Sequence, residues 1–216
     1  VKPRAIDNAP TVQADAIGDG SALFDGGSGE KIVIADDSTL DITDAISICL
    51  WVKVVSARWQ GILDKGALDN TTGDYSIHLS NASPPVVHFG LNGAERAITT
   101  DTVPLNEWTH IACTYDKNAG GADEAKVYLN GVLSKVGDYS TAIATSSTAL
   151  NLGIYLSTYS LSGNLCQVGL WDAALTQAQI QSIMEKTYEE LTASEKTNLV
   201  SYWALDEADG NGVVDK

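Results

Sequence analysis

The sequence has 216 residues, of which 44% are hydrophobic, so it is long enough for one domain with a core that needs no disulfide staples. It carries 28 acidic and 13 basic residues, and the formal net charge of -15 repels nucleic acid and anionic membrane surfaces. Without a run of eighteen or more apolar residues, we expect a soluble chain that binds no nucleic acid and does not insert into a membrane.

The chain begins with a segment, residues 1–20, whose two prolines and weak periodicity predict an N-terminal arm or linker. From Ser21 onward, short alternating segments separated by Gly, Asn, Asp and Pro predict β-strands. The expected strands are 21–25, 30–35, 46–55, 60–65, 74–80, 86–91, 96–99, 108–115, 125–129, 132–136, 149–153 and 161–171. Their spacing predicts two packed antiparallel sheets, an all-β sandwich.

The most informative segment is 106–131. Ile111, Cys113 and Tyr115 alternate with smaller or polar residues, which predicts a strand with one apolar side. A turn-rich break at 116–123 precedes a second strand, which ends at Asn130-Gly131, one of the strongest hairpin signals. We therefore expect two consecutive hairpins here.

A short helix follows the last long strand. Thr176 and Gln179 form a capping box, and apolar residues at helical spacing follow it. Thr192 with Glu195 repeats the signal, so the helical segment is expected over about 176–198. The alternating residues 199–206 predict a strand that returns beside the first strand, and 207–216 form a tail that is either an end or the start of a further repeat.

The same residues carry a resemblance. Trp108 before a strand ending in Thr-Tyr-Asp, followed by Val-Tyr-Leu-Asn-Gly at 127–131, resembles the laminin-G-like family of concanavalin-A-like jelly rolls. Further matches occur in order from about 21 to 183. The resemblance implies an antiparallel two-sheet jelly-roll sandwich over 21–206, with a short C-terminal helix and a returning C-terminal strand. Lectins, adhesins, hydrolases and structural modules all use this fold.

Three cysteines, Cys49, Cys113 and Cys166, lie within expected strands. Their odd number and spacing match neither a disulfide framework nor a metal site, so we expect small buried hydrophobes. Unpaired core thiols favour folding in a reducing cytosol.

Catalysis is not expected. Glucan-cutting enzymes of this fold resemble one another in an acidic triplet on one strand, which this sequence lacks. The acidic pairs at 36–37, 189–190 and 206–207 fall at turns or helix ends, where carboxylates are usually solvated. His78, His88 and His110 are far apart in sequence and are interpreted as structural, and the resemblance makes His110 a packing position.

Calcium is the only cofactor considered, and none is required. Pentraxins, in the wider family, hold calcium with an Asp-Asn pair and later acidic residues. Asp69-Asn70 stands in a comparable loop, but residues 153–160 contain no carboxylate. Either a single calcium ion binds near Asp25, Asp69, Asn70 or Asp74, or these residues form Asx turns.

Aromatic residues bear on sugar binding, because sugar rings stack on exposed Trp or Tyr. Four tryptophans in strands are expected to fill the sandwich: Trp51, Trp108, Trp171 and Trp203. The candidate ligand-binding residues, near loops, are Trp59, Tyr155 and Tyr159, together with Asp69 and Asn70.

We therefore predict a non-catalytic recognition or structural surface module with weak glycan binding. The ending TASEKTNLVSYW at 192–203 resembles concanavalin-A-like domains of bacterial and phage structural proteins, which implies a virion component (capsid decoration or tail fibre) or an adhesin. The expected partners are other structural proteins or a longer polypeptide, since the chain begins at Val1 rather than Met, and a second copy that binds through the helix face or residues 1–20.

The expected location is the virion surface or the extracellular space. The alternative is a carbohydrate-binding module of a secreted polysaccharide-degrading enzyme.

Overall fold

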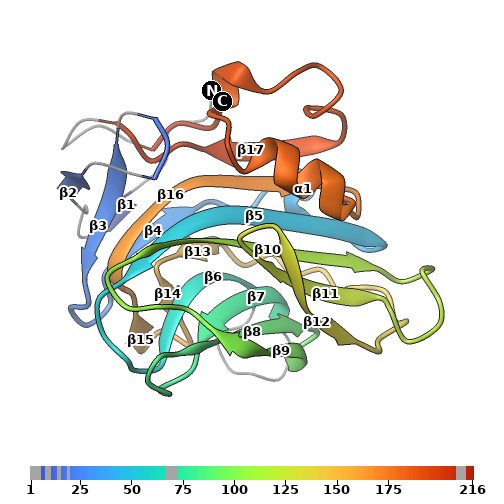
Figure 1. Cartoon of the computed structure of the whole chain (residues 1–216), viewed down its shortest axis with the longest axis horizontal. Helices are drawn as coiled ribbons and strands as arrows, with labels where there is room; N and C mark the ends of the chain where they lie inside the picture. The colour runs from blue at the N-terminus through green and yellow to red at the C-terminus, as the bar shows by residue number, and fades with distance from the viewer. Residues whose placement is uncertain (1–5, 8–10, 14–15, 19, 67–72, 208–212) are drawn as a thin grey trace.

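The computed structural model of the protein describes residues 6–7, 11–13, 16–18, 20–66, 73–207 and 213–216. Two large antiparallel sheets pack face to face, and a small two-stranded hairpin lies beside them (Figure 1). In each sheet, hairpin-connected strands alternate with long crossovers that bring distant strands together, such as β13 with β4 and β6, or β16 with β3 and β5, as in a jelly roll. The predicted all-β two-sheet sandwich is therefore confirmed.

The seven-stranded sheet is ordered β1 (Ile6–Asp7), β4 (Lys31–Ile34), β13 (Leu150–Leu152), β6 (Gln60–Gly66), β7 (Gly73–Leu79), β8 (Val86–Leu91) and β9 (Ala94–Thr102). The eight-stranded sheet is ordered β12 (Val132–Gly137), β11 (Ala125–Leu129), β10 (Trp108–Asp116), β5 (Ala45–Val54), β16 (Ser162–Trp171), β3 (Ser21–Asp25) and β2 (Thr11–Gln13), with β17 (Leu199–Trp203) also paired to β16. The small hairpin joins β14 (Ile154–Tyr155) and β15 (Tyr159–Ser160), and the helical elements are η1 (Ser38–Leu40), α1 (Gln177–Ile183) and η2 (Tyr188–Glu190).

Every strand expected from the sequence is present, with ends that differ by a few residues. The two hairpins around 106–131 are confirmed, and Asn130 and Gly131 both have the positive φ that their tight turn requires. The sequence did not predict β1, β2, β14 or β15. Since β1 pairs with β4 and β2 pairs with β3, the N-terminal segment adds a strand to each sheet.

The main core lies between the two sheets. Ile111, Cys113 and Tyr115 point into it, as their alternation predicts, and are fully buried. All three cysteines are buried and form no disulfide, which confirms their prediction as small hydrophobes. Burial raises the pKa of the Cys49 and Cys113 thiols, which keeps both protonated and unreactive.

A second, smaller core lies between the outer face of the eight-stranded sheet and α1, which crosses above β5 and β16 (Figure 1). The capping box between Thr176 and Gln179 is confirmed, because each side chain accepts a hydrogen bond from the other residue's backbone N–H. Ile180 and Ile183 are buried in this second core. The apolar helix face is therefore packed against the sheet within the chain, and binding of a second copy through the helix stays a prediction.

The returning strand β17 does not pair with the first strand as expected. It pairs with Val168 to Trp171 on β16, while β3 pairs with Ser162 to Leu165 on the same strand. The two strands thus follow one another along one edge of β16, and the register changes at a bulge where Gln167 has a φ of 52°. After α1, the turn at Thr192 keeps the reciprocal bonds with Glu195 without forming an assigned helix.

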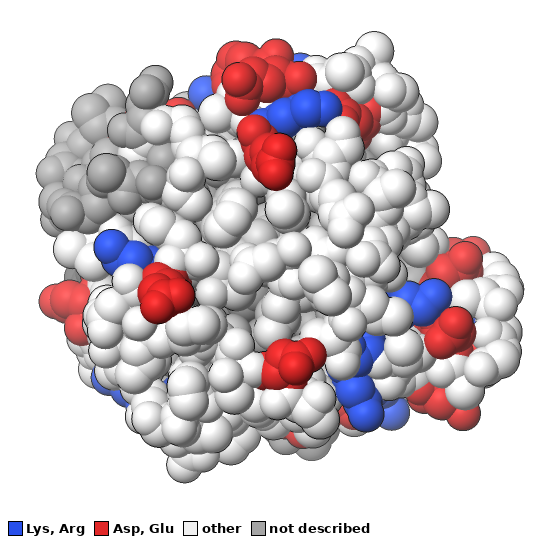
Figure 2. Space-filling view, in the orientation of Figure 1, with Lys and Arg blue, Asp and Glu red and all other residues white. Residues whose placement is uncertain are grey.

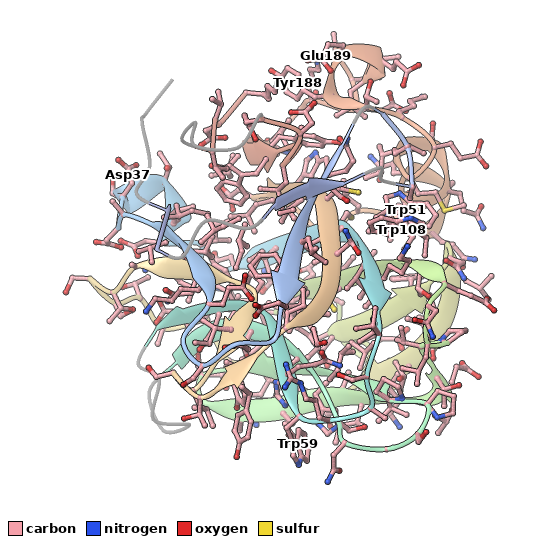
Figure 3. The ribbon with its side chains drawn as sticks, turned by 90° about the vertical axis from the view of Figure 1, so that its left-hand side faces the viewer. Asp37, Trp51, Trp59, Trp108, Tyr188 and Glu189 are labelled. Atoms are coloured by element: carbon pink, nitrogen blue, oxygen red, sulfur yellow. The ribbon has the colours of Figure 1, made fainter. Side chains whose placement is uncertain are left out.

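The four strand tryptophans do not all fill the space between the sheets. Trp203 lies in the main core and Trp171 in the second core under α1. Trp51 and Trp108 are half-buried on the outer face of the eight-stranded sheet (Figure 3). The expectation fails for Trp51, Trp108 and Trp171, because strand alternation turns all three away from the main core. On that outer face, Trp51 donates a hydrogen bond to Met184 O at 2.9 Å.

The surface carries its acidic side chains in separate patches. In the face shown in Figure 2, they gather near the C-terminal segment at the top and around the β10–β11 turn at the right, with little charge between. Within the described ranges, no helix has the length and apolar character needed to span a membrane.

Candidate functional site

The candidate site lies on the face of the seven-stranded sheet that points away from the main core. Strands β7 and β8 place His78 directly opposite His88, and Ser76 opposite Gly90. The intervening residues Ile77 and Phe89 point into the core. The alternation that buries these apolar residues therefore sends both imidazoles to the same outer face.

Glu95 on β9 connects the two histidines. Its Oε1 atom lies 3.2 Å from His78 Nε2 and 2.8 Å from His88 Nδ1. Glu95 is paired with Gly90, and a Cβ atom at Gly90 would lie 2.5 Å from Ser76 Oγ. The missing side chain at Gly90 thus leaves room for the Ser76 hydroxyl, while the Glu95 carboxylate reaches His88 on the adjacent strand β8 and His78 on β7.

Aromatic rings surround the histidines. Tyr155 of β14 stacks on His78 with ring centroids 4.0 Å apart, and Trp59 meets His88 edge-on at 5.3 Å. Tyr159 of β15 stacks loosely on Tyr155 at 6.4 Å and is 36% exposed. Figure 3 shows Trp59 at the opposite edge of the molecule from Tyr188 and Glu189, which places this aromatic group far from the C-terminal segment.

Gly61 on β6 allows the β14–β15 hairpin to approach. A Cβ atom at this position would collide with the backbone of Ile154 and Tyr155. Close backbone approach is a common reason for glycine within a strand. The hairpin, and with it the ring of Tyr155, is therefore held against the sheet by the absence of a side chain at Gly61.

Asp64 lies in the same pocket as His78, Glu95 and Tyr155. It is only 3% exposed, and its Oδ2 atom has no hydrogen-bond partner among the described residues. Burial, reinforced by the charge of Asp74, raises the pKa of Asp64 to about 7. A buried carboxyl group with a free oxygen that lines a pocket is suited to hydrogen-bond a ligand.

The electrostatics keep His78 uncharged. Burial and the neighbouring His88 lower the pKa of His78 to about 4, so its imidazole is neutral at pH 7. Burial would raise the pKa of Glu95, but its contacts with His88 and His78 outweigh that effect and lower it. The site thus combines a carboxylate with a neutral imidazole.

The structure brings together three of the five candidate ligand-binding residues, Trp59, Tyr155 and Tyr159. Their role in binding remains a prediction. The other two, Asp69 and Asn70, lie outside the described residues.

The calcium candidates Asp25 and Asp74 belong to separate hydrogen-bond networks. Asp25 is exposed and accepts a hydrogen bond from Gly27 N at 2.5 Å, an Asx-type turn contact. Asp74 is buried, and its Oδ2 accepts hydrogen bonds from Lys65 Nζ and Ser146. Lys65 is therefore a cationic neighbour that the calcium prediction did not include.

Sequence reasoning missed His78, His88, Glu95 and Asp64, and treated the histidines as unrelated. A signal was present, because His78 and His88 are equally far from Ser83 in the turn between two expected strands. An antiparallel hairpin centred there pairs them. His110 is confirmed as a packing residue, since it is buried with its ring edge-on to Trp51 at 5.3 Å.

The two-sheet fold, with aromatic and polar side chains gathered on an outer sheet face, defines a lectin-type jelly-roll domain. The family described as the concanavalin A-like lectin/glucanases superfamily matches residues 25–181, and the chain belongs to this family.

Solved structures agree on the fold. A putative carbohydrate binding protein from Bacteroides ovatus is 16% identical, with a TM-score of 0.64 over 97% of this chain and 55% of that chain. Domain 4 of the extracellular GH43 arabinanase AbnA from Geobacillus stearothermophilus, in complex with arabinotriose, is 23% identical, with a TM-score of 0.59 over 83% of this chain and 84% of that chain.

Among curated proteins, mouse pappalysin-1 is 24% identical over 76% of this chain. The chain spans only 11% of the length of pappalysin-1 and about half of the Bacteroides ovatus structure.

Proposed function

We propose that this protein is a non-catalytic glycan-recognition module, and that glycans bind on the outer face of the seven-stranded sheet. One observation carries the proposal: the half-buried ring of Trp59 and the exposed ring of Tyr159 lie against His78 and Tyr155, which line a pocket together with polar groups. Sugar rings stack on aromatic faces, while their hydroxyl groups need fixed donors and acceptors. The unpartnered Oδ2 of Asp64 and the carboxylate of Glu95 supply such acceptors.

The similarity to sugar-binding structures supports this proposal. The arabinanase domain was solved with arabinotriose, and the two domains cover each other almost completely. Arabinotriose is therefore the first probe to use.

The test is isothermal titration of the whole chain with arabinotriose, preceded by a glycan array to broaden the search. Trp59→Ala and Tyr159→Ala should each weaken binding roughly tenfold or more, because each removes about 1–3 kcal/mol of ring contact. Trp108→Ala is the matched control, since Trp108 is also half-buried but lies on the eight-stranded sheet. Binding that is lost in the control and kept in Trp59→Ala would overturn the placement of the site.

We infer a structural setting for this module on a virion surface, as a capsid decoration or tail fibre, or on an adhesin. The buried thiols of Cys49, Cys113 and Cys166, none of them in a disulfide, support folding in a reducing cytosol, and the ending at 192–203 resembles phage structural proteins. Mass spectrometry of purified virions from the source should detect the chain, and its absence would count against this setting.

The second setting is a carbohydrate-binding module of a secreted polysaccharide-degrading enzyme. The similarity to an arabinanase domain favours it. The complete gene separates the settings, because a hydrolase domain in the same polypeptide supports the second and neighbouring capsid or tail genes support the first. In either setting, the isolated chain should release no reducing sugar from a β-glucan panel.

Calcium binding near Asp25, Asp69, Asn70 or Asp74 remains a proposal of its own. Calorimetric titration of metal-free protein with Ca²⁺ alone should show binding heat. If Asp25 is a ligand, the Asp25→Asn variant should show less heat. No heat with Ca²⁺ would contradict it.

A further inference from the structure

We propose that His78, His88 and Glu95 form a binding site for a divalent transition-metal ion of the zinc type. The three residues come from three adjacent strands, β7, β8 and β9, and their ligand atoms all lie within 4.8 Å of one another. This inference does not depend on the proposed glycan binding, because the three side chains are defined by the sheet alone.

The distances fit a single ion after small shifts, in which ligand atoms up to 4.8 Å apart approach one another and Glu95 moves slightly away from the two imidazoles. Two ligands bound about 2.1 Å from a tetrahedral ion lie about 3.4 Å apart. Glu95 Oε1 already lies 3.2 Å from His78 Nε2 and 2.8 Å from His88 Nδ1. The ion would therefore replace contacts that now run directly between the carboxylate and the two imidazoles.

The donor set selects the metal. Two imidazole nitrogens and one carboxylate oxygen suit zinc and its neighbours in the transition series, whereas calcium and magnesium prefer oxygen ligands only. A set of three protein ligands leaves a fourth position open on zinc. Glu95, whose side chain is 38% exposed, lies on the open side of the cluster, so the fourth position would face the pocket.

The surroundings hold the ligands in place. His78 is fixed by its stacking on Tyr155, and His88 by its edge contact with Trp59, while their side chains are only 2% and 8% exposed. Ligands whose orientation is set by packing lose little conformational entropy when a metal binds. The cluster thus resembles a preformed site rather than exposed surface residues that meet by chance.

The experiment titrates the full chain, freed of metal and without a histidine tag, with ZnCl₂ in a calorimeter at pH 7. We expect one ion per chain. Glu95→Gln and His88→Gln should each weaken zinc binding by roughly tenfold or more, since each removes a direct ligand. Glu107→Gln, an exposed carboxylate outside the cluster, is the matched control and should leave the affinity unchanged.

A second measurement reports the geometry. Co²⁺ bound to three protein ligands should give the strong visible absorption of a four- or five-coordinate site, and it should quench the fluorescence of Trp59, which lies 5.3 Å from His88. Trp59→Phe removes the quenching and keeps the absorption. Because Glu95 is exposed, Glu95→Gln tests the site even if His88→Gln fails to fold.

The proposal is overturned if zinc produces no binding heat, or if Glu95→Gln binds it as tightly as the unmodified chain. Titration of metal-free protein with arabinotriose is a separate readout. Zinc binding without sugar binding, or the reverse, therefore distinguishes failure of one proposal from failure of the other.

Discussion

The ammonium group of Lys65 lies 3.3 Å from the carboxylate of Asp74, and both side chains are buried beside the candidate site. Lys65 also donates hydrogen bonds to Asp36 at 3.0 Å and to the carbonyl of Ser146 at 2.7 Å. A buried charge with several partners ties β6, β7 and the segment before β13 together. This network supports the strand ends next to Asp64.

We expect Lys65→Met to destabilise the protein strongly, because it leaves the buried carboxylate of Asp74 without its cation. Breaking one side of a buried ion pair costs about 3–5 kcal/mol. Urea unfolding followed by circular dichroism measures the change. Lys117→Met removes an exposed pair with Asp44 and should cost less than about 1 kcal/mol, so equal losses in both variants would contradict the prediction.

Asp64 should make stability fall as pH rises. Its pKa is about 7 in the folded protein and 3.8 ordinarily, so the folded state holds the proton more tightly. The stabilisation is complete below pH 3.8 and is lost as pH rises to about 7, by on the order of 4 kcal/mol. Asp64→Asn should remove this dependence in urea unfolding across a pH series, whereas Asp123→Asn, exposed in the β10–β11 turn, should keep it.

His110 should make stability fall as pH falls, the opposite of the effect of Asp64. Burial lowers its pKa from 6.5 to about 3, so the folded state favours the neutral ring. Its contribution is complete above pH 6.5 and is lost as pH falls toward 3, by up to about 1.4 kcal/mol per pH unit. His110→Phe keeps a ring against Trp51 and should lose less stability between pH 6 and about 4. An unchanged acid profile would show that His110 does not contribute.

Gly61→Ala should displace the β14–β15 hairpin, because its Cβ atom would collide with the backbone of Ile154 and Tyr155. We expect lower stability and weaker arabinotriose binding together, since Tyr155 moves with the hairpin. Gly29→Ala is a useful comparison, because a Cβ atom there meets no neighbour within 4 Å, although its φ of 81° adds backbone strain. A Gly61→Ala variant with full binding would show that the hairpin position does not matter.

The strands were predictable because side-chain alternation is a local property. Ile111, Cys113 and Tyr115 show it in the sequence and are buried in the structure. The short strands β14 and β15 could not be predicted, because their position depends on contact with β6 at Gly61. Alternation also does not reveal which side of a strand faces the main core, so Trp51 and Trp108 were assigned to the wrong side.

The candidate site was predictable only in its aromatic part. Trp59, Tyr155 and Tyr159 stood near loops, where exposed rings are expected. His78, His88 and Glu95 meet only through the register of three strands, and Glu95 reaches the imidazoles of both neighbouring strands. Register can be inferred from hairpin symmetry for the histidines, but the reach of Glu95 requires coordinates.

The arrangement of β3 and β17 along one edge of β16 also bears on how the chain acquires its fold. Strand β16 pairs with β3, which comes early in the sequence, and with β17, which comes late. It also pairs with β5, which is separated from it by about half of the sequence. Contacts so distant in sequence slow folding, because long loops must close first. On the ribosome, this sheet would therefore remain incomplete until residues 199–203 emerge, so the sandwich should close only after its last strand has been synthesised.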